Sequence, residues 1–439
     1  MTSQAWTVRG GPGGLQARLD DLSELSGLHQ ATGTSLGEVL GGLLAVAGDP
    51  LLAAGALLDP GGALRVEEAL LHAAGPGGLG GAEAEAGALA GELRAAVVAY
   101  RLADDAVLAG RLALGQTVGS AVGLAGPALL PLALLSPAAT QRLLTAHPDV
   151  VELTLAGVGA LVSAPGELFA PVPLLSSQQA VLLAGRLVPD TGTLELRELS
   201  TPPAPGDLAA PRTPGDLLRG VARRTLPGEV AVTRLACADG VDRWVVELPG
   251  TDSWSPRPGA DVRDLAGDLR LASGRGSTYS SGVLAVLAAA GAPPGAPVLL
   301  VGHSQGGMAA YAAASSPDLR ARYRVAGVLT AGSPLAAMPV PGGVPVLALE
   351  DAADVVPRLD GLPEPDLPTV TTAVFHRQTG TIAGNHDLTA YAAAADALPA
   401  APSVLAWRRS TRDFLAESQV TSSRRFVLTR RRARPRTPP

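Results

Sequence analysis

The sequence predicts two parts: an all-helical N-terminal module, followed by an α/β domain with a doubly wound, mainly parallel sheet. Two observations predict this. Within residues 1–110, apolar residues recur at the helical period and no segment alternates as a strand does. From residue 229 onward, short apolar segments alternate with helical ones, an order typical of a parallel sheet with helices on both faces.

The first predicted helix carries a stripe of leucines. They recur every three or four positions, at Leu15, Leu19, Leu22, Leu25 and Leu28. Pro and Gly at 48–50 and 59–62 break the helical pattern, because neither residue favours a helix interior. Further helices are therefore expected over 63–72 and 82–108.

An uncharged segment follows at residues 112–141. It is long enough to span a bilayer, which needs about 20 apolar residues. Three prolines and four glycines interrupt it, and no aromatic belt flanks it. These interruptions favour a buried or interface-seeking helical hairpin, with 150–164 as its second arm, over a membrane span. The helical module is thus expected to cover residues 1–165.

The second part is expected to begin with a Pro-rich connector over 166–228 that holds one strand, Thr193–Leu199. The α/β domain is expected over 229–416. Its strands are predicted at 230–236, 244–248, 297–301, 325–330, 344–349 and 370–375, and its helices at 264–272, 282–290, 308–314 and 388–398. The strand at 297–301 is apolar throughout, as expected of a strand buried on both faces.

Residues 417–439 are predicted to form a basic tail. Between Arg424 and Arg436 there are seven arginines and no acid. Runs of like charge are usually solvated, disordered ends, and this is the expectation here. Contact with an anionic lipid surface or with the acidic body of the protein are the alternatives.

The composition excludes several classes of protein. Hydrophobic residues make up 47% of the chain and charged residues 17%, which excludes a disordered chain. The net charge of −6 argues against a nucleic-acid partner. The single cysteine, Cys237, excludes internal disulfides and cysteine-clustered zinc sites, and the histidines lack metal-ligand spacing. No metal and no cofactor are expected.

The strongest chemical motif is Gly302-His303-Ser304-Gln305-Gly306. It lies between a predicted buried strand and a predicted helix. Gly-x-Ser-x-Gly in this context indicates a sharp turn that exposes the serine, with glycines where a Cβ would collide. The motif predicts Ser304 as a nucleophile.

A nucleophilic serine needs a base and an acid that orients the base, in the chain order Ser, acid, His. His386 lies in a loop before a helix and is the predicted base; His376, at the end of a strand, is the alternative. Asp354 follows the strand at 344–349 and is the predicted acid. Glu350 and Asp351 are the alternative carboxylates.

The developing oxyanion needs donors on both sides of the nucleophile. The backbone N–H of Gln305 is one predicted donor. Thr251, after the strand at 244–248, is the other, because it offers both an N–H and a hydroxyl next to Gly250.

Residues 244–398 resemble the α/β-hydrolase superfamily, and most closely its class 3, fungal-lipase-like lipases. The matching motifs are Gly250-Thr251-Asp252-Ser253, Gly-His-Ser-x-Gly at 302–306, Asp354-Val355-Val356-Pro357, and His386 shortly before Tyr391. The chain departs from the family at Pro249, where an Arg is common, and has no long aromatic lid. The resemblance implies an α/β-hydrolase sheet and hydrolysis of a carboxylic ester of an acyl-lipid type through an acyl-enzyme.

The alternative function is an interaction protein with a degenerate hydrolase scaffold. A complete Ser, Asp and His set speaks against it, because a scaffold has no need of all three. Transfer of the acyl group to another acceptor, or peptide hydrolysis, stays open on the same residues.

The N-terminal module resembles helical domains of type VII secretion substrates. Tyr100-Arg101-Leu102-Ala103-Asp104 fits their Tyr-x-x-x-Asp pattern and places Tyr100 and Asp104 on one helix face, although the Trp-x-Gly turn is missing. No signal peptide is visible at residues 1–10. The resemblance implies a small helical secretion partner and export to the cell envelope or medium; a cytoplasmic location is the alternative.

Overall fold

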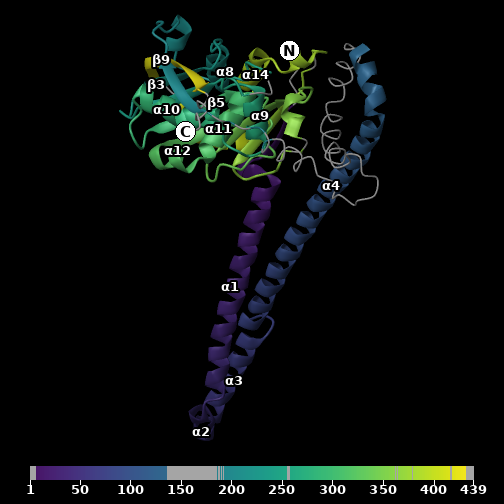
Figure 1. Cartoon of the computed structure of the whole chain (residues 1–439). Coiled ribbons are helices and arrows are strands. Elements are labelled where there is room, and N and C mark those ends of the chain that lie inside the picture. Colours follow the sequence, from purple (N-terminus) through teal and green to yellow (C-terminus); the bar gives the residue numbers. More distant parts are fainter. Residues whose placement is uncertain are drawn as a thin grey trace, which may run out of the picture. The chain divides into compact units, whose positions relative to one another are not determined.

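The computed structural model describes residues 6–135, 185, 188, 190, 192–254, 258–360, 362, 364–377, 379–415 and 418–431. The chain divides into two compact units (Figure 1). Residues 16–109 form one, here called the helical unit. Residues 1–15 together with 110–439 form the other, here called the sheet unit.

The helical unit is built from α1 (Leu15–Ala47), α2 (Pro50–Leu58), α3 (Pro60–Ala74) and the first part of α4 (Leu79–Leu135). The predicted breaks at 48–50 and 59–62 are confirmed. Asp49 and Asp59 cap α2 and α3, accepting hydrogen bonds from the backbone N–H groups of Leu51 and Gly62. A proline follows each cap at the first helical position, where its missing N–H costs nothing.

Helices α1 and α4 pack side by side in antiparallel order. The Ser26 hydroxyl donates to the Ala90 carbonyl at 2.8 Å, and Gly33 lies against the backbone of Gly87. Small residues at these positions let the two backbones approach closely. Arg101 pairs with Asp20 at 3.4 Å at the exposed edge of the same contact.

The backbone of α4 continues through residues 112–135, so this part of the uncharged segment is helical. The rest of the expected hairpin, including its second arm at 150–164, lies outside the described residues. In the described part of the chain no single helix has the length and hydropathy of a membrane span. The pair α1 and α2, bent by 45°, reaches both only when taken together.

The sheet unit contains a nine-stranded mixed sheet with the order β1-β8-β7-β6-β5-β4-β3-β9-β2. Its strands are β1 (Trp6–Gly10), β2 (Thr193–Glu198), β3 (Glu229–Cys237), β4 (Arg243–Leu248), β5 (Pro297–His303), β6 (Arg324–Ala331), β7 (Val346–Asp351), β8 (Val370–Phe375) and β9 (Ser418–Arg431). The strands predicted from the sequence are therefore confirmed to within a few residues.

The expectation of a mainly parallel sheet is wrong at the edges. Strands β4 to β8 are parallel neighbours, but β3, β9, β2 and β1 all pair antiparallel. Strands β3 and β4 are joined by the short turn at Ala238-Asp239-Gly240, and so short a connection can only reverse the chain.

Two strands contradict the sequence-based expectations. Residues 1–110 are not wholly helical, because Trp6–Gly10 pairs with β8 at the sheet edge. Residues 418–431 are not a disordered basic tail, because they form β9 between β3 and β2. Of the three alternatives weighed for the tail, contact with the acidic body describes this segment: Arg424, Arg425 and Arg431 pair with Glu198, Glu229 and Glu195.

Helices cover both faces of the sheet. They are α8 (Pro214–Ala222), α9 (Leu265–Ala272), α10 (Thr278–Ala290), α11 (Gln305–Ser315), α12 (Pro317–Arg322), α13 (Ile382–Asn385), α14 (Leu388–Asp396), α15 (Pro402–Ser410) and α16 (Arg412–Leu415). Helix α8 lies in the expected connector, yet Leu217, Leu218 and Val221 are buried in the core. Among the described residues of the unit, short 3-10 turns lie at Gly11–Gly13, Pro205–Leu208 and Val356–Asp360.

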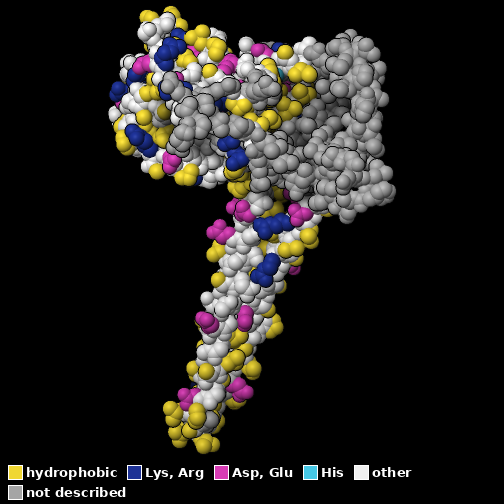
Figure 2. All heavy atoms as spheres, viewed as in Figure 1, with side chains coloured by type: hydrophobic (Ala, Val, Ile, Leu, Met, Phe, Trp, Pro, Cys, Tyr) yellow, Lys and Arg dark blue, Asp and Glu magenta, His cyan; other side chains and the backbone are white. Residues whose placement is uncertain are grey.

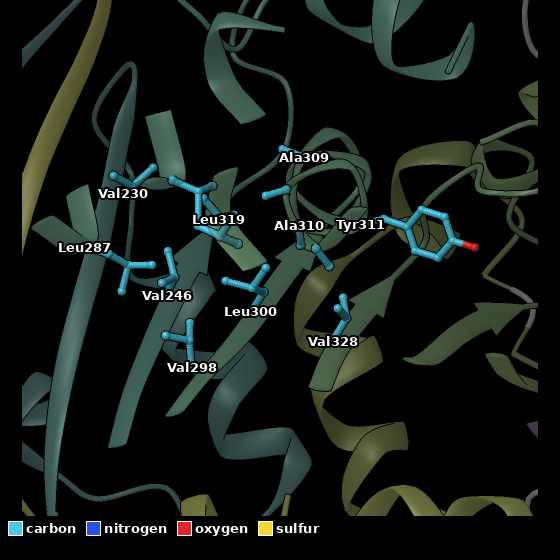
Figure 3. Packing of buried hydrophobic residues seen from close by; sticks show 14 of the residues in the cluster. Val230, Val246, Leu287, Val298, Leu300, Ala309, Ala310, Tyr311, Leu319 and Val328 are labelled. Atoms are coloured by element: carbon cyan, nitrogen blue, oxygen red, sulfur yellow. The ribbon is translucent and has the colours of Figure 1, made fainter. Parts of the chain in front are cut away.

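Two apolar clusters form the core, one on each face. Val298 and Leu300 of β5 point toward α10, α11 and α12 in the first cluster (Figure 3). Leu299 and Val301 point toward α8, α14 and α15 in the second. Side chains alternate along a strand, so an all-apolar strand fills both clusters at once. This rigid centre holds the turn at residue 304.

Candidate active site

The turn from β5 into α11 holds Ser304 in a strained backbone conformation. Its φ is 54° and its ψ −124°, and no other non-glycine residue in the described ranges has a positive φ. Such strain costs about 1–3 kcal/mol and is maintained only where the surroundings enforce it. Here the Ser304 N–H donates to the Ala331 carbonyl of β6 at 2.9 Å.

Both glycines of the motif are required by space. A Cβ on Gly302 would lie 2.2 Å from the carbonyl oxygen of Gly306. A Cβ on Gly306 would lie 1.9 Å from the carbonyl oxygen of Leu248. The first turn of α11 therefore packs directly on the end of β4, which brings the loop after β4 up to Ser304.

His386 and Asp354 meet, although 32 residues separate them in the chain. Asp354 follows β7, His386 follows α13, and His386 Nδ1 lies 2.6 Å from Asp354 Oδ2. The carboxylate is fully buried, while the imidazole keeps 18% of its side chain exposed. Because Nδ1 is held by the carboxylate, Nε2 is left free for another partner.

Asp354 has two further donors that fix its orientation. Its Oδ1 accepts from the Val356 N–H at 2.9 Å, and its Oδ2 accepts from the Tyr391 hydroxyl at 2.8 Å. Burial raises the pKa of Tyr391 well above its ordinary value, so the phenol stays protonated and can donate. The Tyr391 hydroxyl in turn accepts from the Asp351 N–H at 3.0 Å.

His386 lies beside the turn that carries Ser304. Its ring is 4.5 Å, centre to centre, from the ring of His303, the residue before Ser304. His303 Nε2 donates to the His386 carbonyl at 3.2 Å. Burial, with a smaller contribution from His386, lowers the pKa of His303 well below its ordinary value, so that ring is neutral.

Asn385, the only asparagine of the chain, ties the histidine loop to the acid loop. Its Nδ2 donates to the Ala353 carbonyl at 2.9 Å. Its Oδ1 accepts from the N–H and the hydroxyl of Thr379. These three hydrogen bonds of the buried amide hold the loop of His386 against the loop of Asp354.

The alternative residues lie elsewhere. His376 is exposed at the end of β8. Asp351 accepts from the N–H groups of Ala353 and Arg377, and burial raises its pKa to about 6. Burial also raises the pKa of Glu350 to about 7. The structure brings Asp354, and neither Asp351 nor Glu350, into hydrogen-bonding contact with His386.

Both predicted oxyanion donors lie in segments that adjoin Ser304: Gln305 follows it in the chain, and Thr251 follows Gly250. The Gln305 N–H begins α11 and has no acceptor among the described residues. Gly250 approaches so closely that a Cβ there would be 3.0 Å from Ser304 Cβ. A hydrogen bond from α10 fixes the loop that carries Thr251: the buried Tyr279 hydroxyl donates to the Pro249 carbonyl at 2.9 Å.

The Thr251 hydroxyl is not free, contrary to the sequence-based expectation. It donates to Asp268 Oδ2 on α9 at 3.0 Å. Burial raises the pKa of Asp268 to about 7. The Thr251 backbone N–H, by contrast, has no acceptor in the described part of the chain.

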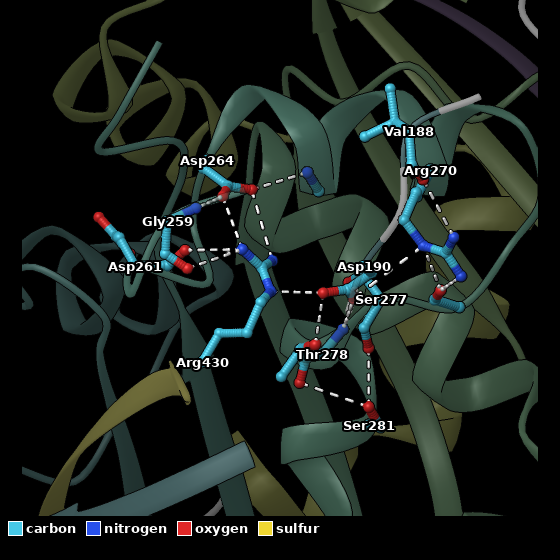
Figure 4. Close-up of polar contacts among 12 residues, drawn as sticks. Val188, Asp190, Gly259, Asp261, Asp264, Arg270, Ser277, Thr278, Ser281 and Arg430 are labelled. Carbon is cyan, nitrogen blue, oxygen red and sulfur yellow. Dashed lines mark hydrogen bonds and ion pairs between the residues drawn. The ribbon is translucent and has the colours of Figure 1, made fainter. Parts of the chain in front are cut away.

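A buried ion cluster supports this loop from the C-terminal strand (Figure 4). Arg430 of β9 pairs with Asp264 at 2.7 Å and with Asp190. Asp264 caps α9, and its carbonyl accepts from Gln305 Nε2 at 2.9 Å. Arg430 is therefore linked through one residue to the side chain of the predicted oxyanion donor.

The sequence patterns assign no role to four residues that support the site, which are Tyr391, Asp268, Asp264 and Arg430. Only Tyr391 had a visible cue, its spacing from His386 in the family resemblance. The described residues contain no cluster of three or more His, Cys, Asp and Glu side chains that could hold a metal ion.

Comparison of the chain with protein-family models and with curated proteins gave no match.

Proposed function

We propose that the sheet unit is a serine hydrolase of the α/β-hydrolase superfamily that cleaves a carboxylic ester. The observation that carries the proposal is the 2.6 Å contact between His386 and Asp354 beside the strained turn at Ser304. Strain, a buried carboxylate and an oriented imidazole cost stability, and a purely structural loop has no use for all three.

In this mechanism Ser304 Oγ attacks the ester carbonyl, and His386 Nε2 takes its proton. Asp354 holds the ring through Nδ1 and stabilises the imidazolium that forms. The N–H groups of Gln305 and Thr251 donate to the oxyanion. His386 then protonates the leaving alcohol, and water, activated by the same ring, releases the acid from Ser304.

An acyl-lipid type of ester is the substrate class that the class 3 lipase motifs imply. Labelling with a fluorophosphonate probe tests the chemistry before the substrate is known. The intact protein is expected to react at one residue, and Ser304→Ala is expected to abolish the reaction. An unreactive wild type would instead support the alternative of an interaction protein with a degenerate scaffold.

Hydrolysis of p-nitrophenyl esters of increasing chain length then defines the acyl group. Adding an alcohol or amine acceptor separates hydrolysis from acyl transfer, because transfer yields a new ester or amide while the nitrophenol release continues. A peptide substrate in place of the ester tests protease chemistry on the same residues.

We also propose export by a type VII-like pathway with a small helical partner, to the cell envelope or medium. Tyr100 is 56% exposed on α4, and Asp104 is exposed one turn later, so both are accessible to such a partner. Fractionation of a native-host culture tests this. Wild type confined to the cytosol, or export unchanged by Tyr100→Ala/Asp104→Ala, would contradict it.

A further inference from the structure

Helix α2 has a composition that suits neither a surface helix nor a connecting turn. Its sequence, Pro50–Leu58, contains no polar side chain. Across residues 39–58, the end of α1 together with α2, Asp49 is the only charged residue. These residues are here called the apolar tip. A helix that is apolar on every side is normally buried in a core or in a membrane.

The apolar tip is not buried. Leu51, Leu57 and Leu58 are 80%, 86% and 90% exposed. Val39, Leu44 and Val46 of α1 are each at least half exposed. Figure 2 shows hydrophobic side chains gathered at the end of the helical unit. Scattered exposed leucines are ordinary, but adjoining ones on two helices mark a surface that is covered in use.

We propose that the apolar tip inserts into the surface of a lipid bilayer. The pair α1 and α2 has the length and hydropathy of a membrane-spanning helix, with a 45° bend at residues 48–49. Core helices of soluble proteins can have the same hydropathy, but they are mostly buried, and the tip is exposed. A bent apolar pair at a chain reversal is suited to entering a bilayer from one side and returning.

The shape of the patch favours lipid over a single partner helix. A partner helix covers one stripe along one helix axis. Here the exposed side chains lie on two helices whose axes differ by 45°, so they form no single stripe. Lipid chains surround whatever enters them and need no matching stripe.

The charges of the tip determine which kind of lipid headgroup it is expected to bind. No arginine or lysine occurs between Arg18 and Arg65, so the tip has no permanent positive charge to attract anionic headgroups. The carboxylates of Asp49 and Asp59 accept from N–H groups at 2.7 and 2.9 Å, which satisfies part of their hydrogen bonding near the headgroups. Binding is therefore driven by apolar burial, and is expected on zwitterionic lipid and to persist in high salt.

The experiment is flotation of the full-length protein with phosphatidylcholine vesicles, at low and at high salt. Wild type is expected to float equally in both. Leu57→Gln/Leu58→Gln is expected to lower the bound fraction about tenfold or more, since two leucines lose their apolar burial. The matched control is Leu102→Gln on α4, which is 63% exposed and far along the helix pair from the tip.

Several outcomes would overturn the proposal: a wild type that stays with the aqueous fraction, a double variant that floats like wild type, or flotation that requires anionic lipid. Sedimentation without vesicles tests a second copy as the occupant. A wild-type dimer that Leu57→Gln/Leu58→Gln converts to a monomer would assign the tip to self-association and refute insertion. None of these measurements depends on hydrolysis, so the result is independent of the proposed function.

Discussion

The two units of this protein differ in how far they expose the same type of side chain, leucine. In the sheet unit, Leu299 and Leu300 of β5 are fully buried, each on its own face. In the helical unit, Leu57 and Leu58 are almost fully exposed at the end of α2. The hydropathy of a segment alone does not predict whether its leucines are buried or exposed. The alternation of strands with helices predicts burial, because helices then cover both faces of the sheet. Two paired helices bury only the side chains between them.

Charges follow the same division. In the sheet unit, Arg430 and Asp264 are each 1% exposed and paired with one another. In the helical unit, Arg101 and Asp20 pair with both side chains 51% exposed. Removing one partner of a buried pair leaves an uncompensated charge, whereas an exposed pair is weak in water. Removing one partner of a buried pair in the sheet unit should therefore have a large effect, and removing one partner of an exposed pair in either unit a small one.

The largest effect is expected at the paired histidine and carboxylate. His386→Ala and Asp354→Asn are each expected to lower kcat for ester hydrolysis by about 10⁴-fold, because the triad acts as a unit. His376→Ala and Asp351→Asn are the controls and are expected to retain most activity. Steady-state kinetics on a p-nitrophenyl ester measures all four; a dead His376→Ala with an active His386→Ala would reverse the assignment of the base.

The next largest effect, on stability, is expected at the buried Arg430 of β9, in comparison with the partly exposed Arg424 of the same strand. Arg430→Met is expected to destabilise the protein by about 3–5 kcal/mol, because Asp264 remains buried without a cation and Asp190 keeps only Arg270, at 4.0 Å. Arg424→Met, on the same strand, breaks a pair with Glu198 whose side chains are 35% and 43% exposed. It is expected to cost about 0–1 kcal/mol. Urea denaturation measures both, and equal losses would refute the distinction.

A smaller effect is expected from Asp268, whose ionisation makes the free energy of unfolding depend on pH. Its pKa in the native state is about 7, against an ordinary value of 3.8. Between these values the native protein keeps the proton that the unfolded chain has lost, so stability falls as pH rises from about 4 to 7. Asp268→Asn removes this term and is expected to flatten the fall by roughly 1–3 kcal/mol.

Denaturation at several pH values tests this, with the exposed Asp318→Asn as the matched control. A variant whose stability falls as steeply as that of wild type would show that Asp268 is ionised in the native state at pH values well below 7.

The smallest effect on stability is expected at the apolar tip. Leu57→Gln/Leu58→Gln is expected to leave the free energy of unfolding within about 0.5 kcal/mol per site, because neither side chain is buried in the free protein. Leu299→Ala, in the core, is expected to cost about 2–5 kcal/mol. A large loss from the tip variant in urea denaturation without lipid would mean that the tip is covered in solution.

The sequence was informative where local chemistry decides the structure. The apolar run at 297–301, the glycines around Ser304 and the loop positions of Asp354 and His386 are all local features, and each lies where the pattern predicts. The hydrogen bond between Asp354 and His386 follows from their placement at the same edge of the sheet. Their catalytic roles stay predictions.

The sequence failed where the partner is distant in the chain. The run of arginines in β9 predicts a solvated tail, yet the acids that pair with them lie on β2 and β3. Strand β1 is short and pairs with residues about 365 positions later. The Thr251 hydroxyl was expected to be free because nothing in the local motif points to Asp268 on α9.

The place of β9 in the sheet also bears on how this protein acquires its fold during synthesis. Strands β2 and β3 leave the ribosome early, but each pairs with β9 and not with the other. The opposite edge is likewise closed by β1, which waits for β8. The nascent chain therefore carries unpaired strand edges until residue 431 has been made. Such non-local pairing is slow, and open edges aggregate, so yield on expression is expected to depend on chaperones and on the rate of translation.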